Sequence, residues 1–232
     1  MKTIIWSLFD SETAITQDLN SDKYKVYSIG LPSSSSITDN FIKIDLSKRS
    51  CLNKLSKLPK PDIIFASPPC ETWVTVSVGQ LQHYANRKYD ERNLYWNHSF
   101  KGNDLTRRLR ENRIQGQKTA YWTYRIIKEF DPGMWVIENG ISSNIFKYLS
   151  NFFGLIGYKN ICRYSSYCNI EFSEKPTIFY SNKKMKLRKY KTKSNIKIDK
   201  SKTKYSDRSK VPIQVYRDIL NHYEGYGQQT LF

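Results

Sequence analysis

The chain is poor in the residues that hold metal ions and disulfides. It has four cysteines and three histidines among 232 residues, and no two cysteines form a CxxC pair. Structural zinc sites and disulfide frameworks are built from Cys and His at short, regular spacings. Neither kind of site is therefore predicted, and we expect the thiols to be reduced, as in an intracellular protein.

Long hydrophobic runs are also missing. The apolar stretch at residues 1–6 is too short for a signal peptide and leads directly into polar residues. Elsewhere no stretch approaches the roughly 20 apolar residues that a membrane-spanning helix needs. The sequence therefore predicts a cytoplasmic protein with no membrane partner.

Acidic residues are scarce relative to basic ones. Lys and Arg number 38 against 21 Asp and Glu, which gives a formal net charge of +17. Such an excess attracts a polyanion through counterion release and long-range steering. Because no basic amphipathic helix suggests a membrane surface, the predicted partner is a nucleic acid, which would place the protein at the nucleoid. General solubility is the alternative explanation of the charge.

Two stretches concentrate the basic residues. Residues 183–210 hold thirteen Lys and Arg against two Asp, which predicts a segment that is either unstructured or lying on nucleic acid. Residues 74–113 look irregular and interleave aromatic rings with arginines, which suits base stacking and phosphate binding. A packed insertion with solvated charges is the alternative there. The residues that we predict to bind DNA in these stretches are Arg87, Arg92, Arg107, Arg108, Arg188 and Lys189.

Short apolar strands alternate with helical segments along most of the chain. Apolar and β-branched runs predict strands, and apolar residues at helical spacing predict helices. The expected strands are 3–9, 25–31, 41–46, 63–66, one around Trp135, and 159–164; the expected helices are 14–19, 52–58, 117–130 and 146–155. This alternation predicts an α/β fold with a doubly wound, mostly parallel sheet.

The strand 63–66 runs into a stiff elbow. Pro68 and Pro69 cannot donate ladder hydrogen bonds, and each pushes the residue before it out of the α region. Cys70 therefore stands just beyond the carboxyl end of a buried strand, at the edge where open α/β sheets bind ligands. A thiol on such a loop is a candidate nucleophile. A buried structural cysteine is the alternative.

The stretch Ser67-Pro68-Pro69-Cys70 resembles the nucleophile loop of the DNA cytosine-5 methyltransferases. Residues 135–140, Trp-Val-Ile-Glu-Asn-Gly, are similar to that family's strand ending in Glu-Asn-Val. The resemblance implies a Rossmann-like methyltransferase domain over 1–180, a reduced basic recognition segment at 181–210 and a C-terminal helix within 211–232. It also implies cytosine in DNA as the substrate and S-adenosyl-L-methionine as the cofactor.

The resemblance also implies roles for single residues. Cys70 would add to C6 of a flipped cytosine, and the carboxyl of Glu138 would hydrogen-bond N3 and the exocyclic amine. Asn139 would hold the Glu138 loop in place, and Lys175 matches a basic residue near the target base. The positions that would bind the cofactor are Phe9, Asp10, Ser11, Asp45, Ser67 and Ser209.

The cofactor side departs from the family's pattern. The turn at 9–13 has no glycine where the family has a Gly-rich turn, and the second strand ends at Gly30-Leu31 without an acidic residue. A Cβ in such a turn can clash with the ligand or oppose a positive φ.

Several alternatives therefore stay open. The turn could keep its shape with another sequence, or the chain could be a catalytically impaired or cofactor-altered DNA-binding relative, including one that modifies pyrimidines differently. It could also be one subunit of a two-chain enzyme or a homo-oligomer. Amino-group methylation is disfavoured because Cys70 stands where a base-stacking aromatic would be needed.

Overall fold

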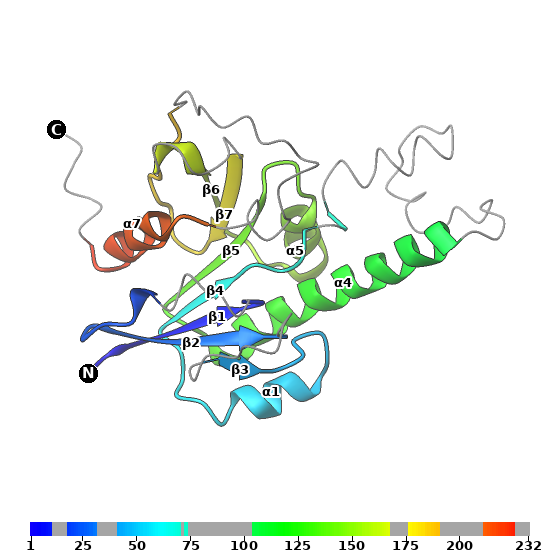
Figure 1. Ribbon diagram of the computed structural model, residues 1–232, viewed down its shortest axis with the longest axis horizontal. Helices are drawn as coiled ribbons and strands as arrows, with labels where there is room; N and C mark the ends of the chain where they lie inside the picture. The colour runs from blue at the N-terminus through cyan, green and yellow to red at the C-terminus, as the bar shows by residue number, and fades with distance from the viewer. Residues whose placement is uncertain are drawn as a thin grey trace.

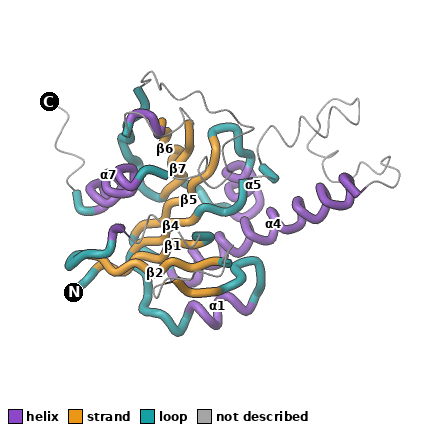
Figure 2. Tube along the Cα trace, in the orientation of Figure 1, coloured by secondary structure: helices purple, strands orange, loops and turns teal. Residues whose placement is uncertain are grey.

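A computed structural model describes residues 1–10, 18–31, 41–70, 72–73, 104–167, 176–190 and 211–225. Its strands are β1 Thr3–Leu8, β2 Tyr24–Gly30, β3 Phe41–Lys43, β4 Ile63–Ala66, β5 Met134–Gly140, β6 Tyr158–Arg163 and β7 Pro176–Ser181. They form one sheet in the order β3-β2-β1-β4-β5-β7-β6 (Figures 1 and 2). β1 to β5 run parallel, and β7 is antiparallel to both of its neighbours.

Helices cover both faces of this sheet. They are α1 Ser50–Leu55, α4 Asp104–Phe130, α5 Ile145–Phe153 and α7 Ile213–Tyr223, with a short 3-10 turn, η2, at Tyr164–Ser166. α1, α4 and α5 contribute to one hydrophobic core, and α7 contributes to the core on the opposite face. α4 continues well past the sheet (Figure 1). For residues 104–110 and 112 of α4, only the backbone is described.

The central strands are buried on both faces. In β4, Ile63 and Phe65 belong to the core under α7, whereas Ile64 and Ala66 belong to the core under α1, α4 and α5. A parallel sheet between two layers of helices has no polar face, so its strands read as continuous apolar runs. This is why the apolar runs, rather than an alternating pattern, located β1, β4 and β5 in the sequence.

The predicted fold class is confirmed: the chain is an α/β protein with a doubly wound, mostly parallel sheet. The strand order changes direction between β1 and β4. Ligands of such sheets bind at the carboxyl ends of the strands that flank this switch point. The two segments that follow β1 and β4 here are the Phe9-Asp10 turn and the loop that carries Cys70.

Two predictions about irregular segments are wrong in part. α4 begins at Asp104, so the end of the predicted irregular stretch 74–113 is helical; residues 104–115 contain no Pro or Gly and many good helix formers. Residues 183–190 are not unstructured, because Met185 and Leu187 are buried in the core under α7, whereas the basic side chains of this stretch are exposed. The rest of both stretches, and most of the helix predicted at 14–19, lie outside the described residues.

The carboxyl end of β2 packs tightly onto the turn after β1. An ideal Cβ on Gly30 would lie 2.4 Å from the backbone oxygen of Asp10. Because that oxygen belongs to the backbone, we expect Gly30→Ala to lower the free energy of unfolding by about 1–3 kcal/mol. Gly133→Ala is the matched control, since its nearest neighbour would be 3.6 Å away. Thermal unfolding compares the two variants, and equal losses of stability would contradict this account of the packing.

Candidate active site at the carboxyl edge of the sheet

Cys70 lies on a loop that continues β4. The backbone N–H of Ser67 donates to the carbonyl of Leu8 at 3.2 Å, which extends the pairing of β4 with β1 past the end of the strand. After the two prolines, the N–H of Trp73 donates to the carbonyl of Cys70 at 2.9 Å and closes a turn. The Cys70 side chain is partly exposed and is a thiol. The elbow predicted from the prolines therefore presents Cys70 at the carboxyl edge.

The far side of this loop is fixed by α4 and α5. Trp73 is buried, and the guanidinium of Arg113 lies 4.8 Å from its ring centroid. Arg113 also donates to the carbonyl of Thr72 at 3.3 Å. On the other side, the N–H of Asn144 donates to the carbonyl of Trp73 at 2.9 Å. Cys70 is thus held between the end of β4 and an anchored tryptophan.

Asn139 joins the second motif to the first. β4 and β5 pair in parallel up to Ala66 and Ile137, so the residues that follow emerge side by side. The buried side chain of Asn139 donates from Nδ2 to the carbonyl of Pro68 at 3.0 Å. This hydrogen bond ties the end of β5 to the loop that carries Cys70. The structure thereby brings Cys70, Glu138 and Asn139 to one edge, as the sequence predicted.

The carboxyl of Glu138 is bonded to a buried tyrosine. The hydroxyl of Tyr164 donates to Oε1 of Glu138 at 3.1 Å. Burial first, and the negative charge of Glu138 second, raise the pKa of Tyr164 well above that of an exposed tyrosine. The phenol therefore stays protonated and remains a donor over the whole range of ordinary pH. Sequence reasoning missed this residue, because a lone Tyr after a strand carries no distinguishing pattern.

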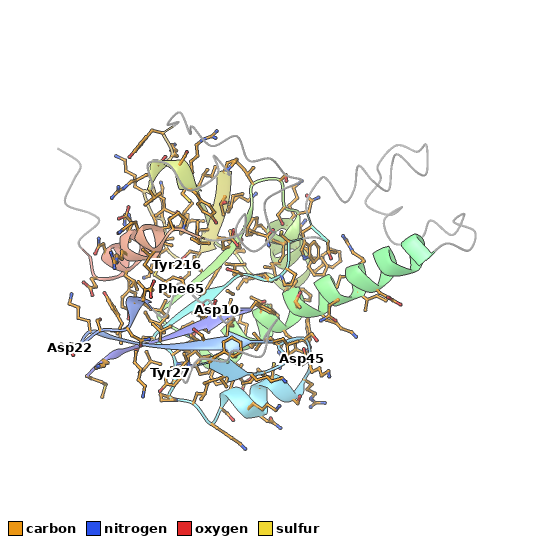
Figure 3. All side chains as sticks on the ribbon, viewed as in Figure 1. Asp10, Asp22, Tyr27, Asp45, Phe65 and Tyr216 are labelled. Carbon is orange, nitrogen blue, oxygen red and sulfur yellow. The ribbon has the colours of Figure 1, made fainter. Side chains whose placement is uncertain are left out.

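A second tyrosine, Tyr216 of α7, reaches the same edge. Its ring meets Phe65 of β4 edge-on, with centroids 5.0 Å apart (Figure 3). Burial first, and then the charges of Asp10 and Glu138, raise the pKa of Tyr216, while a side-chain hydrogen bond with Ser67 opposes this. Tyr216 thus lies among the ends of β1, β4 and β5. In the sequence, nothing distinguishes Tyr216 from the other buried residues on the apolar face of α7.

The turn after β1 adopts a positive φ without glycine. Phe9 has φ 61°, in the left-handed region, and the N–H of Asp10 donates to the carbonyl of Ile29 at 3.1 Å. A non-glycine residue in this conformation costs on the order of 1–3 kcal/mol. Packing of the Phe9 ring against the core on the side of α4 offsets part of that cost. The turn therefore places a phenylalanine in the backbone conformation that glycine adopts most readily.

Asp45 is engaged in its own turn after β3. Its Oδ1 accepts hydrogen bonds from the N–H of Ser47 at 3.0 Å and the hydroxyl of Ser47 at 2.6 Å. The ammonium of Lys48 lies 3.2 Å from Oδ2. Burial opposes ionisation, but the hydrogen bonds from Ser47 and Lys48 outweigh it and lower the pKa of Asp45. Its predicted place near an adenine stays a prediction.

The predicted DNA-binding residues are placed only in part. Arg188 forms an ion pair with Asp218 of α7 at 3.2 Å and stacks on Tyr167, so it also links α7 to the segment after β7. Lys189 is exposed. For Arg107 and Arg108, only the backbone is described, within α4. The predicted positions that lie outside the described residues are Ser11, Arg87, Arg92, Lys175 and Ser209.

In the part of the chain that the structure describes, no group of three or more His, Cys, Asp or Glu side chains is arranged to hold a metal ion. Within the same ranges, no helix is long and apolar enough to cross a membrane.

Comparisons with known proteins add a distant likeness. No family model and no curated protein matches the sequence. Among solved structures, the chain is similar to a candidate DNA modification methyltransferase encoded within a prophage of E. coli, with 13% identity and a TM-score of 0.45. The match covers 78% of this chain and 46% of that one. At this level of likeness, the function has to be inferred from the site itself.

The described cysteines should differ sharply in reactivity. Cys51 is buried, and burial raises the pKa of its thiol to about 11, so at pH 8 only about one Cys51 in a thousand is a thiolate. Cys162 is buried as well, whereas Cys70 is partly exposed. In the native protein we expect iodoacetamide to alkylate Cys70 at least tenfold faster than either. Peptide mass spectrometry measures this, with the urea-unfolded protein as control; equal native rates would contradict the placement of Cys70.

Proposed function

We propose that this chain is an S-adenosylmethionine-dependent DNA cytosine-5 methyltransferase. One observation carries the proposal: the hydrogen bond from Asn139 to the carbonyl of Pro68, which holds the loop of Cys70 against the strand of Glu138. A thiol and a carboxyl on adjacent strand ends can act on one planar ring from two sides. Separately, each residue has an ordinary structural explanation.

In the proposed reaction Cys70 is the nucleophile. Its thiolate forms a bond to C6 of cytosine, and the displaced electron pair makes C5 nucleophilic. The carboxyl of Glu138, in its protonated form, donates a hydrogen bond to N3 and accepts one from the exocyclic amine, and so stabilises the charge that develops on the ring. C5 would take up the methyl group that S-adenosylmethionine supplies, and the neutral thioether would be the leaving group. Water then accepts the C5 proton, and the electron pair of the C5–H bond breaks the Cys70–C6 bond and restores the thiolate. The base has to leave the duplex before it meets either residue.

The residues at the switch point fit the predicted cofactor in part. S-adenosylmethionine, when bound, supplies the electrophilic methyl group. The left-handed backbone at Phe9 supports a turn that allows close approach of a ligand, and Asp10 and Ser67 follow the two strands that flank the switch point. Phe9, Asp10 and Ser67 would hold the cofactor there, with Ser11, Asp45 and Ser209 as further predicted contacts.

DNA is the proposed substrate because of the charge of the chain. The net charge of +17 favours a phosphate backbone, and Arg107, Arg108 and Arg110 belong to the first part of α4, a helix that continues past the sheet (Figure 1). In this proposal Arg107 and Arg108 contact phosphates, together with Arg87, Arg92, Arg188 and Lys189. Lys175 contacts the flipped base.

One observation favours a second candidate, a DNA-binding relative that does not transfer methyl groups. β2 ends at Gly30 with no acidic residue after it, so the carboxylate that would bind the ribose hydroxyls of the cofactor is missing. Methyl transfer by a complex of this chain with a second subunit is a variant of the first proposal. The addition of Cys70 to a base separates the candidates, since a binding module makes no such bond.

Duplex DNA of mixed sequence in which 5-fluorocytosine replaces cytosine tests the proposal. Fluorine at C5 leaves no proton to remove after methyl transfer, so the Cys70–C6 bond cannot break and the protein stays attached to the DNA. With S-adenosylmethionine present, we expect a complex that survives denaturing electrophoresis, located at Cys70 by mass spectrometry. Glu138→Gln should slow its formation by about 10²-fold or more, the size of effect seen when one transition-state hydrogen-bonding group is lost.

The matched control is Cys70→Ser, which keeps the size of the side chain and removes the thiol. It should bind the same DNA within a few-fold and form no denaturation-resistant complex. Tight binding of DNA by the wild-type protein without any such complex would contradict cytosine-5 chemistry and favour the DNA-binding alternative.

A further inference from the structure

The carboxyl of Glu138 is part of a line of hydrogen bonds that crosses three elements. The hydroxyl of Tyr164, at the start of η2, donates to Oε1 of Glu138 in β5 at 3.1 Å. The hydroxyl of Thr177, in β7, is hydrogen-bonded to the same phenol. Tyr164 and Thr177 are both 0% exposed. The hydroxyls of Tyr164 and Thr177 are therefore shielded from water, and only the carboxyl of Glu138 is partly exposed.

The strand pairing explains how these residues meet. β7 lies between β5 and β6, and Thr177 is paired with Gly140 on one side and with Cys162 on the other. Glu138 is paired with Phe179, two residues along β7 from Thr177. Tyr164 follows β6 directly, so its ring enters the sheet edge between the ends of three strands. The contact depends on the sheet order and not on a local sequence pattern.

We propose that Tyr164, supported by Thr177, is a positioning residue that fixes the carboxyl of Glu138 in one orientation at the carboxyl edge of the sheet. The catalytic meaning of this role rests on the proposed function, but the contact itself does not. With Oε1 held by a buried donor, the substrate meets a carboxyl whose oxygens already have fixed places.

A purely structural explanation accounts less well for this arrangement. A buried phenol that needs only a hydrogen-bond partner can use a backbone carbonyl, as Tyr180 does with Leu155 at 2.9 Å. Tyr164 instead donates to an acid. A hydrogen bond to an ionised acceptor is stronger than one between neutral groups, and hydrogen bonds in series strengthen one another. The line from Thr177 to Glu138 thus holds Oε1 of Glu138 in one place.

Other titratable groups lie near this line of hydrogen bonds. Among the described residues they include the phenol of Tyr216 on α7, which feels the charges of Glu138 and of Asp10 after β1, and the thiol of Cys162 on β6, which acts on Tyr164 and Tyr216. Tyr216 and Cys162 are buried, and Asp10 carries the same charge as an ionised Glu138. Removal of the Tyr164 hydroxyl leaves all three in place.

Tyr164→Phe tests the role, because it removes the hydroxyl and keeps the buried ring. A hydrogen bond to the charged form of an acid favours that form, so Glu138 should titrate at higher pH in the variant. The measurement is a 13C NMR titration of the glutamate carboxyls, with the Glu138 signal assigned through Glu138→Gln. Tyr167→Phe is the matched control: it removes a nearby phenol hydroxyl that accepts from the N–H of Arg188 and should leave the Glu138 titration unchanged.

Thr177→Val is the second variant, and it should move the Glu138 titration in the same direction by a smaller amount. In methyl-transfer assays Tyr164→Phe should lower kcat at least several-fold with little change in the KM for DNA. An unchanged titration in a Tyr164→Phe protein with wild-type circular dichroism would overturn the inference. If the titration shifts but the wild-type protein does not methylate DNA, the positioning role of Tyr164 is supported and only the proposed function is refuted.

Discussion

The site depends on one hydrogen bond, from the side chain of Asn139 to the carbonyl of Pro68. Pro68 begins a segment with no N–H at two successive positions, so this loop cannot fix itself by ladder pairing. Asn139 supplies the missing link from the neighbouring strand, in a place where it is itself buried. The nucleophile loop and the strand end of Glu138 are therefore one rigid unit. Loss of this bond would leave each motif intact and loosen the link between the two.

Next to Glu138, the described part of the structure has neutral phenols in buried positions where a charged group would lose its hydration. Among the described residues, the hydroxyl of Tyr164 donates to the carboxyl of Glu138, and the phenol of Tyr216 lies near it. Burial raises the pKa of both tyrosines, so both remain uncharged next to an acid. An ammonium or guanidinium in the same buried place would pay a large desolvation cost. Because the phenol of Tyr164 is neutral, it holds the carboxyl of Glu138 without forming an ion pair with it.

The sequence predicted those parts of the molecule that depend on local patterns. The apolar runs located the parallel strands, and two prolines located the elbow before Cys70. It could not predict Tyr164, Tyr216 or Thr177, because their roles come from β7 lying between β5 and β6 and from α7 returning to β4. It also could not show that Phe9 adopts a positive φ, because the contacts that stabilise this backbone are tertiary. The ring of Phe9 packs against the core, and Gly30 leaves room for the backbone oxygen of Asp10.

The central claim is that Cys70 and Glu138 act together on cytosine. It is tested most directly by nucleoside analysis of DNA incubated with the protein and S-adenosylmethionine. Liquid chromatography with mass spectrometry should find 5-methylcytosine with the wild-type protein, none with Cys70→Ala, and at most traces with Glu138→Gln. DNA left unmodified by a wild-type protein that binds both DNA and cofactor, or equal methylation by Cys70→Ala, would contradict the account.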